Sequence, residues 1–320
     1  MKRWRPSQAS LNSFLLKPLQ FKRPKRQING ILLLDKPIGF SSNQALQKIK
    51  WLLKAAKAGH TGTLDPLATG LLPLCFGEAT KFAHFLTDAD KTYIATIKLG
   101  ATTTTGDAEG DVLTTSPVHV TRDEFEAACQ QFTGEISQTP PMYSALKFEG
   151  KALYEYARAG VEIERKSRRV TIQNIEVNSF AGDVAVISVT CSKGTYIRTL
   201  AEDIGKQLGC GAHLIGLRRT ATADYLIAQA ITLEQFEAMS EEERLAALAP
   251  PDSAVHYLPA ITLDDDGAFY LMQGQAVWRS GAVPSGLLRL YNEQQVFLGL
   301  GELQDDGKIA PKRLMQQVNN

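Results

Sequence analysis

The sequence predicts an α+β protein with a mixed, largely antiparallel sheet, followed by a small β-rich C-terminal domain. Two stretches rich in Val and Ile, 170–178 and 184–190, follow each other without a long helix between them, so they should pair antiparallel. Amphipathic helical patterns occur elsewhere, the longest over 42–56. The last roughly 65 residues contain several short strand patterns, which suit a small β-barrel.

Composition restricts the class of protein. The chain has 320 residues, of which 44% are hydrophobic and 22% charged, as in ordinary globular proteins. No apolar run approaches the roughly 18 to 20 residues that cross a bilayer, so no membrane partner is expected. Four scattered cysteines predict buried, reduced thiols in a cytoplasmic protein and no metal site. They are Cys75, Cys129, Cys191 and Cys210.

Charge is unevenly distributed along the chain. Residues 1–28 carry eight Lys and Arg and no acid, and 151–220 hold 11 basic against 7 acidic side chains. Residues 221–320 hold 6 basic and 14 acidic ones. This pattern predicts a basic disordered tail over 1–28 and one basic face on the body. A polyanion partner and a merely solvated tail are equally compatible with charge alone.

The first half of the body has clear element signals. Residues 30–34 form a short apolar run that predicts a buried strand, and Ser41 or Ser42 can cap the helix that follows. Residues 92–99 alternate as a half-buried strand with Tyr93 on its core face. A capping box at 121–124 predicts another helix.

The second half predicts a helix over 200–208 and two short helices within 232–248. The Pro250-Pro251 dipeptide ends them and marks a boundary between domains 29–250 and 251–320. Beyond it, we expect a helix near 264–273 and strands near 276–278, 287–291 and 296–299.

The densest chemical signal is the segment GHTGTLDPLATGLL at 59–72. Its glycines and Pro66 constrain the chain around Asp65 before an apolar stretch that we expect to be helical, which would place the carboxylate at the end of a rigid element. On local pattern alone, most such aspartates only cap a helix. His60 alone is likewise more often structural than catalytic.

Other segments hold further candidates. Tyr196 and Arg198 are two residues apart at a predicted strand end and should share a face, where Arg198 could bind a carboxylate or form a weak surface pair. Tyr93 follows Lys91-Thr92 and could be core only. The acidic run 107–111 lacks the bidentate Glu of a Ca²⁺ loop, so it predicts a plain solvated turn.

Five segments together resemble the TruB-type tRNA pseudouridine synthases over residues 28–320. They are 29–37, 59–72, 91–93, 139–147 and 194–200, in the family's order. The resemblance implies a pseudouridine synthase fold in the first domain and a PUA-like RNA-binding module at the C-terminus. It also implies isomerisation of uridine to pseudouridine at position 55 in the tRNA T-loop, with base flipping and without cofactor or metal.

The resemblance assigns roles to individual residues. It makes Asp65 the essential aspartate, which either attacks the ribose-uracil unit or removes a sugar proton. Tyr93 stacks on the base and acts in the final proton removal from C5, and Arg198 pairs with Asp65. The substrate-binding residues implied are His60, which helps extrude the uridine, Tyr196 and Leu217. The family's usual ending after Leu217 is replaced here by Ala223-Asp224, which leaves the form of that turn open.

The expected partner is the T-arm of tRNA, bound by a monomer in the cytoplasm without a guide RNA. Phosphate contacts should weaken as salt rises. They are expected from Lys48, Lys50, Lys54, Lys57, Arg165, Lys166, Arg168 and Arg169. Three alternatives stay open: an RNA-binding or tRNA-folding protein without turnover, a dyskerin-like subunit that needs a guide RNA, and a metal-dependent nuclease using Asp107, Glu109 and Asp111.

Overall fold

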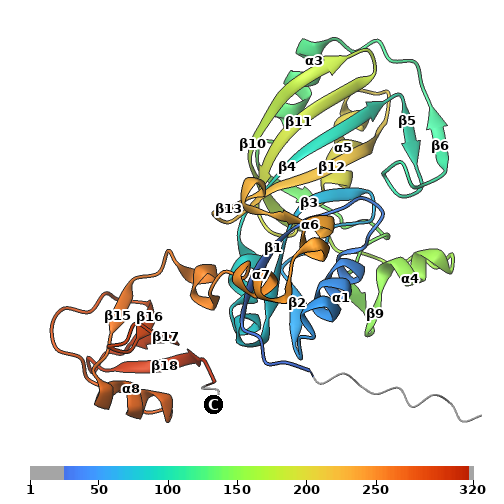
Figure 1. Ribbon diagram of the computed structural model, residues 1–320. Coiled ribbons are helices and arrows are strands. Elements are labelled where there is room, and N and C mark those ends of the chain that lie inside the picture. Colours follow the sequence, from blue (N-terminus) through green and yellow to red (C-terminus); the bar gives the residue numbers. More distant parts are fainter. Residues whose placement is uncertain (1–24, 317–320) are drawn as a thin grey trace, which may run out of the picture.

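The computed structural model describes residues 25–316 (Figure 1). Its main body is a ten-stranded mixed sheet in the order β14-β1-β3-β12-β4-β11-β10-β7, with β13 paired to β12 and β2 to β3. The strands are β1 (Gly30–Lys36), β2 (Ala58–His60), β3 (Ala68–Phe76), β4 (Lys91–Leu99), β7 (Gly134–Gln138), β10 (Arg168–Ala181), β11 (Val184–Cys191), β12 (Ala212–Thr222), β13 (Tyr225–Leu226) and β14 (Ile231–Thr232).

The predicted mixed, largely antiparallel pairing is confirmed. The β10 and β11 strands pair antiparallel, and only the β1·β14 and β3·β12 pairs are parallel among the strands of this sheet within residues 25–316. Along β4, Tyr93 and every second residue after it are buried, as the alternation predicts. The sheet therefore places β4 and β12 side by side at its centre.

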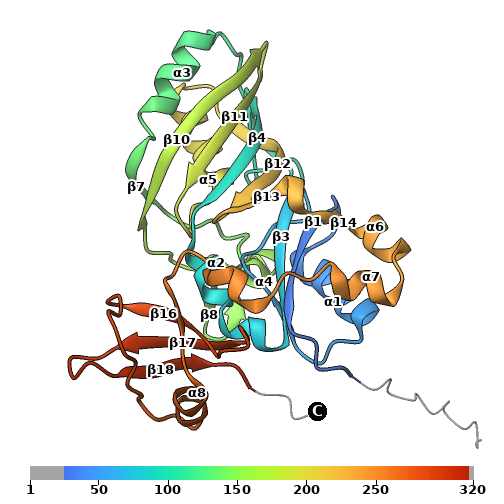
Figure 2. The same ribbon diagram turned by 60° about the vertical axis from the view of Figure 1, so that its left-hand side comes forward.

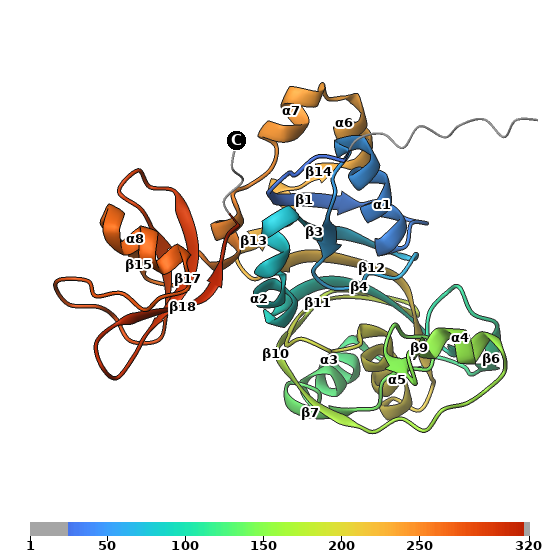
Figure 3. The ribbon, with the colours of Figure 1, turned by 90° about the horizontal axis from the view of Figure 1, so that it is seen from below.

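Helices cover the sheet on both sides. Those of the main body are α1 (Ser42–Leu53), α2 (Ala83–Asp88), α3 (Arg122–Gln130), α4 (Leu153–Arg158), α5 (Ile197–Gln207), α6 (Leu233–Ala238) and α7 (Glu241–Ala246), with short 3-10 turns at Gly77–Lys81, Ile227–Gln229 and Pro251–Val255. Figure 3 shows α3 and α5 inside the curve of the sheet, and α1, α6 and α7 at the β1 end. None of the helices described is long and apolar enough to cross a membrane.

Two small hairpins extend from the body. They are β5 (Ala101–Thr103) with β6 (Val112–Thr115), and β8 (Lys147–Phe148) with β9 (Lys151–Ala152). The capping box predicted at 121–124 is present in α3, Ser240 and Glu243 form another at the start of α7, and Ser41 is the N-cap of α1. The helix expected over 200–208 begins three residues earlier, at Ile197.

Two expected elements are wrong. The strand expected near 276–278 is only an isolated bridge between Val277 and Ile309. The apolar stretch after Asp65 is the strand β3 and not a helix. Pro73 lies in its middle, where a helix would lose a hydrogen bond, and Gly70 has a φ of 101°. The run is continuously apolar because β3 is buried on both faces between β1 and β12.

The turn after β12 takes a tight form. Thr222 pairs with Tyr225, so Ala223 and Asp224 form a two-residue hairpin loop. Ala223 has a φ of 48°, a left-handed conformation that costs an alanine about 1 kcal/mol. The backbone N–H of Ala223 donates to the Asp90 carbonyl at 3.0 Å, which helps to hold it there.

A second sheet forms the C-terminal part of the chain, in the order β15 (Ala260–Thr262), β16 (Leu287–Tyr291), β17 (Phe297–Leu303) and β18 (Ile309–Leu314). With α8 (Asp265–Met272) it encloses its own core around Leu271 and Leu290. The strand β18 escapes prediction because Pro311 and charged residues break its pattern, as an edge strand allows.

The C-terminal sheet lies against the main body, as Figure 2 shows. Phe82 and Phe297 pack with ring centroids 5.4 Å apart, and the Lys81 ammonium donates to the Leu314 carbonyl at 2.8 Å. The domain boundary at residue 250 stays a prediction. Most of the predicted 1–28 tail lies outside the described residues, but Arg26 already hydrogen bonds to the Lys54 carbonyl at 2.8 Å.

We predict that Gly70→Ala is destabilising, because a Cβ there would lie 2.3 Å from the Arg219 carbonyl oxygen on β12. The free energy of unfolding should fall by about 2 kcal/mol or more, measured by urea denaturation. Gly59→Ala is the matched control, since apart from its chain neighbours no described residue comes within 4 Å of a Cβ built there. Equal losses in the two variants would contradict the close approach of β3 and β12.

Candidate active site

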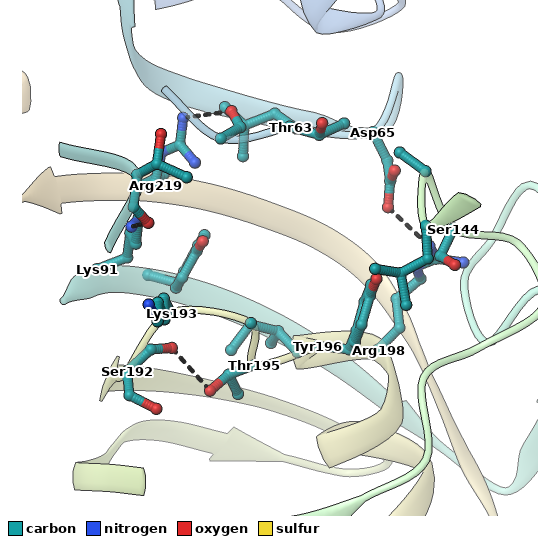
Figure 4. A pocket seen from close by; sticks show the side chains of 18 of the residues that line it. Thr63, Asp65, Lys91, Ser144, Ser192, Lys193, Thr195, Tyr196, Arg198 and Arg219 are labelled. Atoms are coloured by element: carbon teal, nitrogen blue, oxygen red, sulfur yellow. Dashed lines mark hydrogen bonds and ion pairs between the residues drawn. The ribbon is translucent and has the colours of Figure 1, made fainter. Parts of the chain in front are cut away.

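A pocket of about 560 Å³ opens over the centre of the main sheet. Its walls come from the turn 61–67, from β4 and β12, from the start of α5 and from residues 144–146 (Figure 4). The sequence separates these segments by up to about 150 residues, and the sheet order brings them together. The pocket gathers Asp65, Tyr93, Tyr196, Arg198 and Leu217, five of the six residues predicted for catalysis and substrate binding.

Asp65 stands in the turn between β2 and β3, which we call the Asp65 turn (residues 61–67). It caps no helix: its carbonyl accepts from the Ala68 N–H at 3.0 Å, and its carboxylate is free to face the pocket. Oδ2 of Asp65 lies 2.9 Å from Nη2 of Arg198. The predicted pair between these two residues is therefore formed.

Arg198 is held from several sides. It is the second residue of α5, and its side chain is 7% exposed. Besides Asp65, the guanidinium donates to the carbonyls of Thr105 at 2.7 Å and Tyr143 at 2.6 Å. The expectation that Arg198 shares a strand face with Tyr196 is wrong, because the strand ends at Cys191 and α5 has already begun. The helix start, and not a strand face, aims the guanidinium at Asp65.

Asp107 is a second carboxylate beside Arg198. Its Oδ2 lies 3.5 Å from Nε of Arg198, and its Oδ1 accepts from Thr105 Oγ1 at 2.6 Å and from the Glu109 N–H at 3.0 Å. Asp107 is 3% exposed, so the expected solvated turn is wrong at this residue. A carboxylate can be buried there because the arginine compensates its charge.

The acidic run does not form a metal site. No group of three or more His, Cys, Asp or Glu within residues 25–316 is placed to hold a metal ion. Asp107 pairs with Arg198, whereas Asp111 is exposed. The geometry gives no support to the nuclease alternative.

The surroundings of Asp65 raise the pKa of its carboxyl group. Loss of water in the pocket raises the pKa of the Asp65 carboxyl and outweighs the opposing effect of the Arg198 guanidinium. The negative charge of Asp107 also raises this pKa. The raised pKa means that the folded protein binds a proton at Asp65 more readily than the unfolded chain does.

Tyr93 and Leu217 supply the apolar wall. Tyr93 is 8% exposed, and burial raises the pKa of its phenol. Arg219, which the sequence analysis missed, lies across from Tyr93 on β12 and is 1% exposed. Its Nε donates to the Leu71 carbonyl at 2.6 Å, so it ties β12 to the chain after the Asp65 turn. In the sequence, only the apolar and β-branched residues around Arg219 indicate that it lies in a strand.

Of the remaining two predicted substrate-binding residues, Tyr196 lines the pocket and His60 does not. Tyr196 precedes the first residue of α5, and the Arg168 guanidinium lies 4.9 Å from the centre of its ring. His60 lies on β2, paired with Leu74, and does not line the pocket. Burial lowers the pKa of His60, and its Nδ1 atom has no hydrogen-bond partner among the described residues.

The predicted phosphate-binding cations fall into two groups. Arg168 and Arg169 line the pocket, together with Lys193, which the sequence analysis did not select. Lys48 on α1 and Lys54 just after its end instead pair with Glu237 at 2.6 Å and Glu241 at 3.2 Å, respectively. The Arg165 guanidinium donates to the Pro140 carbonyl at 3.2 Å, while Lys57 and Lys166 are exposed and Lys50 is half-buried.

We predict that Asp107→Asn lowers the pKa of the Asp65 carboxyl, because it removes a like charge. In the unaltered protein that pKa should lie above about 3.9, the value for aspartate in peptides. Carbon-detected NMR titration measures the pKa of the Asp65 carboxyl in the variant and in the unaltered protein. Asp88→Asn is the control, since Asp88 also lines the pocket but pairs with Lys193 at 3.0 Å. An unchanged or higher pKa in Asp107→Asn would contradict the prediction.

Comparison with known families finds three adjacent matches. The TruB family pseudouridylate synthase (N terminal domain) matches residues 50–197. The tRNA pseudouridylate synthase B C-terminal domain matches 198–256, and Pseudouridine synthase II TruB, C-terminal, matches 259–315.

Similar proteins agree with these matches. A tRNA pseudouridine synthase B from Methylobacillus flagellatus is 62% identical over 300 residues, 94% of this chain and 99% of the relative. One from Stutzerimonas stutzeri is 53% identical and covers 93% and 99%. Among solved structures, a Cbf5-Nop10-Gar1 complex contains a chain with a TM-score of 0.67 and 29% identity, covering 90% of this chain and 84% of that one. A chain of an H/ACA RNP bound to a substrate RNA containing 2'-deoxyuridine has a TM-score of 0.67 and 25% identity, covering 90% and 85%.

Proposed function

Because this chain belongs to the TruB family of pseudouridylate synthases, we propose that it isomerises uridine to pseudouridine at position 55 in the T-loop of tRNAs. The family match confirms the resemblance drawn from the five motifs, and the fold is that of a pseudouridine synthase with a small C-terminal sheet. The observation that supports the proposal is the carboxylate of Asp65, held by a buried arginine in a pocket beside Tyr93.

The chemistry requires a base outside the RNA stack. A uracil inside a folded loop cannot reach a protein carboxylate, so the nucleotide is flipped into the pocket. There the base leaves C1′ of its ribose, rotates and rejoins through C5. Glycoside hydrolases use two carboxylates because one activates water or the leaving group. Here the detached uracil takes the place of water, so a single carboxylate at Asp65 suffices.

Asp65 acts as a carboxylate in either route. It attacks the ribose-uracil unit or removes a sugar proton, and both require the ionised form. Desolvation opposes that form, and the Arg198 guanidinium at 2.9 Å favours it. Arg198 therefore opposes the desolvation that raises the pKa of the Asp65 carboxyl, and so favours the ionised form that the reaction needs.

The pocket walls orient the base. The ring of Tyr93 lies on the core face of β4 and lines the pocket, where it offers a surface on which uracil stacks. Its proposed second role is in the final proton removal from C5. Leu217 closes the pocket on the side of β12, and Tyr196 does so at the start of α5. His60 lies outside the pocket lining, and its proposed role is to help extrude the uridine from the loop.

The protein works without a guide RNA, as a monomer in the cytoplasm. The two relatives described above, each named tRNA pseudouridine synthase B, are 62% and 53% identical to the chain, whereas the similar chain in the Cbf5-Nop10-Gar1 complex is 29% identical. Binding of the T-arm rests on its shape and on phosphate contacts.

We expect the purified protein alone to release tritium from a T-arm RNA labelled at C5 of its uridines, with EDTA present. Asp65→Asn should abolish the release and leave the Kd for the RNA nearly unchanged, because it keeps the shape of the side chain. Asp88→Asn is the matched control and should stay active, since Asp88 lines the same pocket but pairs with Lys193.

Other outcomes of this assay would favour other functions. RNA binding without release would favour a guide-dependent subunit or a binding protein, and loss of release in EDTA would favour a metal-dependent reaction. Mapping of the product by sequencing then decides whether the modified position is 55.

Salt dependence separates the two groups of cations. Arg169→Gln should lower the slope of log K against log salt by about 0.7 to 0.9, the contribution of one phosphate contact. Both side chains are ion-paired in the free protein, Arg169 with Glu135 at 3.0 Å and Lys48 with Glu237 at 2.6 Å. Lys48→Gln should change the slope less, because Lys48 lies on α1 outside the pocket lining, whereas Arg169 lines the pocket. Fluorescence anisotropy at several salt concentrations measures both slopes. A larger effect of Lys48→Gln would place the RNA over α1 instead of over the pocket rim.

A further inference from the structure

The Asp65 turn has little structure of its own. Residues 61–67 lie between β2 and β3 outside any helix or strand. The peptide before Asp65 is nevertheless buried, since Leu64 is 3% exposed. Buried backbone groups need hydrogen-bond partners, so something must satisfy the N–H and the carbonyl of Leu64.

One side chain satisfies both groups. The Ser42 hydroxyl accepts from the Leu64 N–H at 2.7 Å and donates to the Leu64 carbonyl at 3.0 Å. Ser42 is 1% exposed and is the first residue of α1. Its hydroxyl therefore fixes the peptide immediately before the residue proposed to act on the uridine.

The loop between β1 and α1 also holds the other side of Asp65. The N–H of Gly39 donates to the Pro66 carbonyl at 2.8 Å. The loop itself is closed by the buried Lys36 ammonium, which donates to the carbonyls of Pro37, at 3.0 Å, and Phe40. Asp65 thus stands between two backbone anchors, at Leu64 and at Pro66, that come from a single short loop and helix start.

Ser42 is not needed to cap α1. The adjacent Ser41 is the N-cap residue: its hydroxyl accepts from the Gln44 N–H at 3.2 Å, and Gln44 Oε1 accepts from the Ser41 N–H at 2.8 Å. The sequence analysis could not choose between these two serines as caps. In the structure the two serines have different roles: Ser41 caps α1, and the Ser42 hydroxyl hydrogen bonds to Leu64 in the Asp65 turn.

We propose that Ser42 is a positioning residue, whose hydroxyl sets the place of the Asp65 carboxylate relative to Arg198 and to the flipped nucleotide. The inference rests on the proposed function. A carboxylate displaced by about 1 Å can lower a reaction rate on the order of 100-fold, whereas binding of the RNA depends on contacts elsewhere. Loss of the hydroxyl should therefore slow the chemical step and leave RNA affinity unchanged.

The experiment compares two neighbouring serines. Ser42→Ala removes a hydroxyl that makes two hydrogen bonds to Leu64, and Ser41→Ala removes one that accepts from the Gln44 N–H, so both should lower Tm. Single-turnover pseudouridine formation and the Kd for a T-arm RNA are measured for each. We expect the rate to fall about 10- to 100-fold in Ser42→Ala only, with both Kd values close to that of the unaltered protein.

Two further variants test the hydroxyl itself. Ser42→Thr keeps it and should recover most of the rate. Ser42→Cys keeps the size of the side chain but is a weaker donor and acceptor, so its rate should fall between those of the alanine variant and the unaltered protein. If Ser42→Ala does not fold, the test relies on Ser42→Cys. A rate of pseudouridine formation in Ser42→Cys equal to that of the unaltered protein would then overturn the proposal.

The outcomes keep the two proposals apart. Equal rates in Ser42→Ala and Ser41→Ala, with an active unaltered protein, would overturn the positioning role alone. An effect of Ser42→Ala on Kd instead of on the rate would also overturn it. No pseudouridine from the unaltered protein would contradict the proposed function itself.

Discussion

The arrangement of the site depends on the guanidinium of Arg198. It lies almost without solvent contact between Asp65 and Asp107, and it also donates to the carbonyls of Thr105 and Tyr143. A buried cation needs partners for its charge and its donors, and these four contacts supply two carboxylates and two carbonyls. The same contacts fix where the Asp65 carboxylate can stand, so the stability of the buried charge and the geometry of the pocket share one cause.

The fold satisfies this requirement by joining distant segments. The Asp65 turn leads into β3, which pairs with β12, while β4 carries Tyr93 between β12 and β11. α5 begins after β11 and aims Arg198 across the pocket (Figure 4). The turn itself is held from the β1–α1 loop, so its position does not depend on Arg198 alone. A rigid carboxylate and a rigid counter-charge together give the preorganisation that catalysis requires.

Local pattern predicted the elements with strong periodicity and failed where tertiary contacts decide. Alternation placed Tyr93 in the core of β4, and the capping residues placed α3 and α7. The apolar run of β3 looked helical because burial on both faces removes alternation. Asp107 looked solvated because its partner, Arg198, is 91 positions later in the sequence, so no local pattern indicates the pair. The motif resemblance selected the pocket residues, but the anchoring by Ser42 needed the structure, since a serine before a helix reads as a cap.

The most direct test of the central claim is a crystal structure of this protein bound to a T-arm RNA. We predict that the target uridine lies outside the RNA stack with its ring against Tyr93. Its ribose should lie within about 3.5 Å of the Asp65 carboxylate, and the pair between Asp65 and Arg198 should be intact. A uridine that stays in the loop, or an Arg198 that leaves Asp65 to bind a phosphate, would contradict the claim.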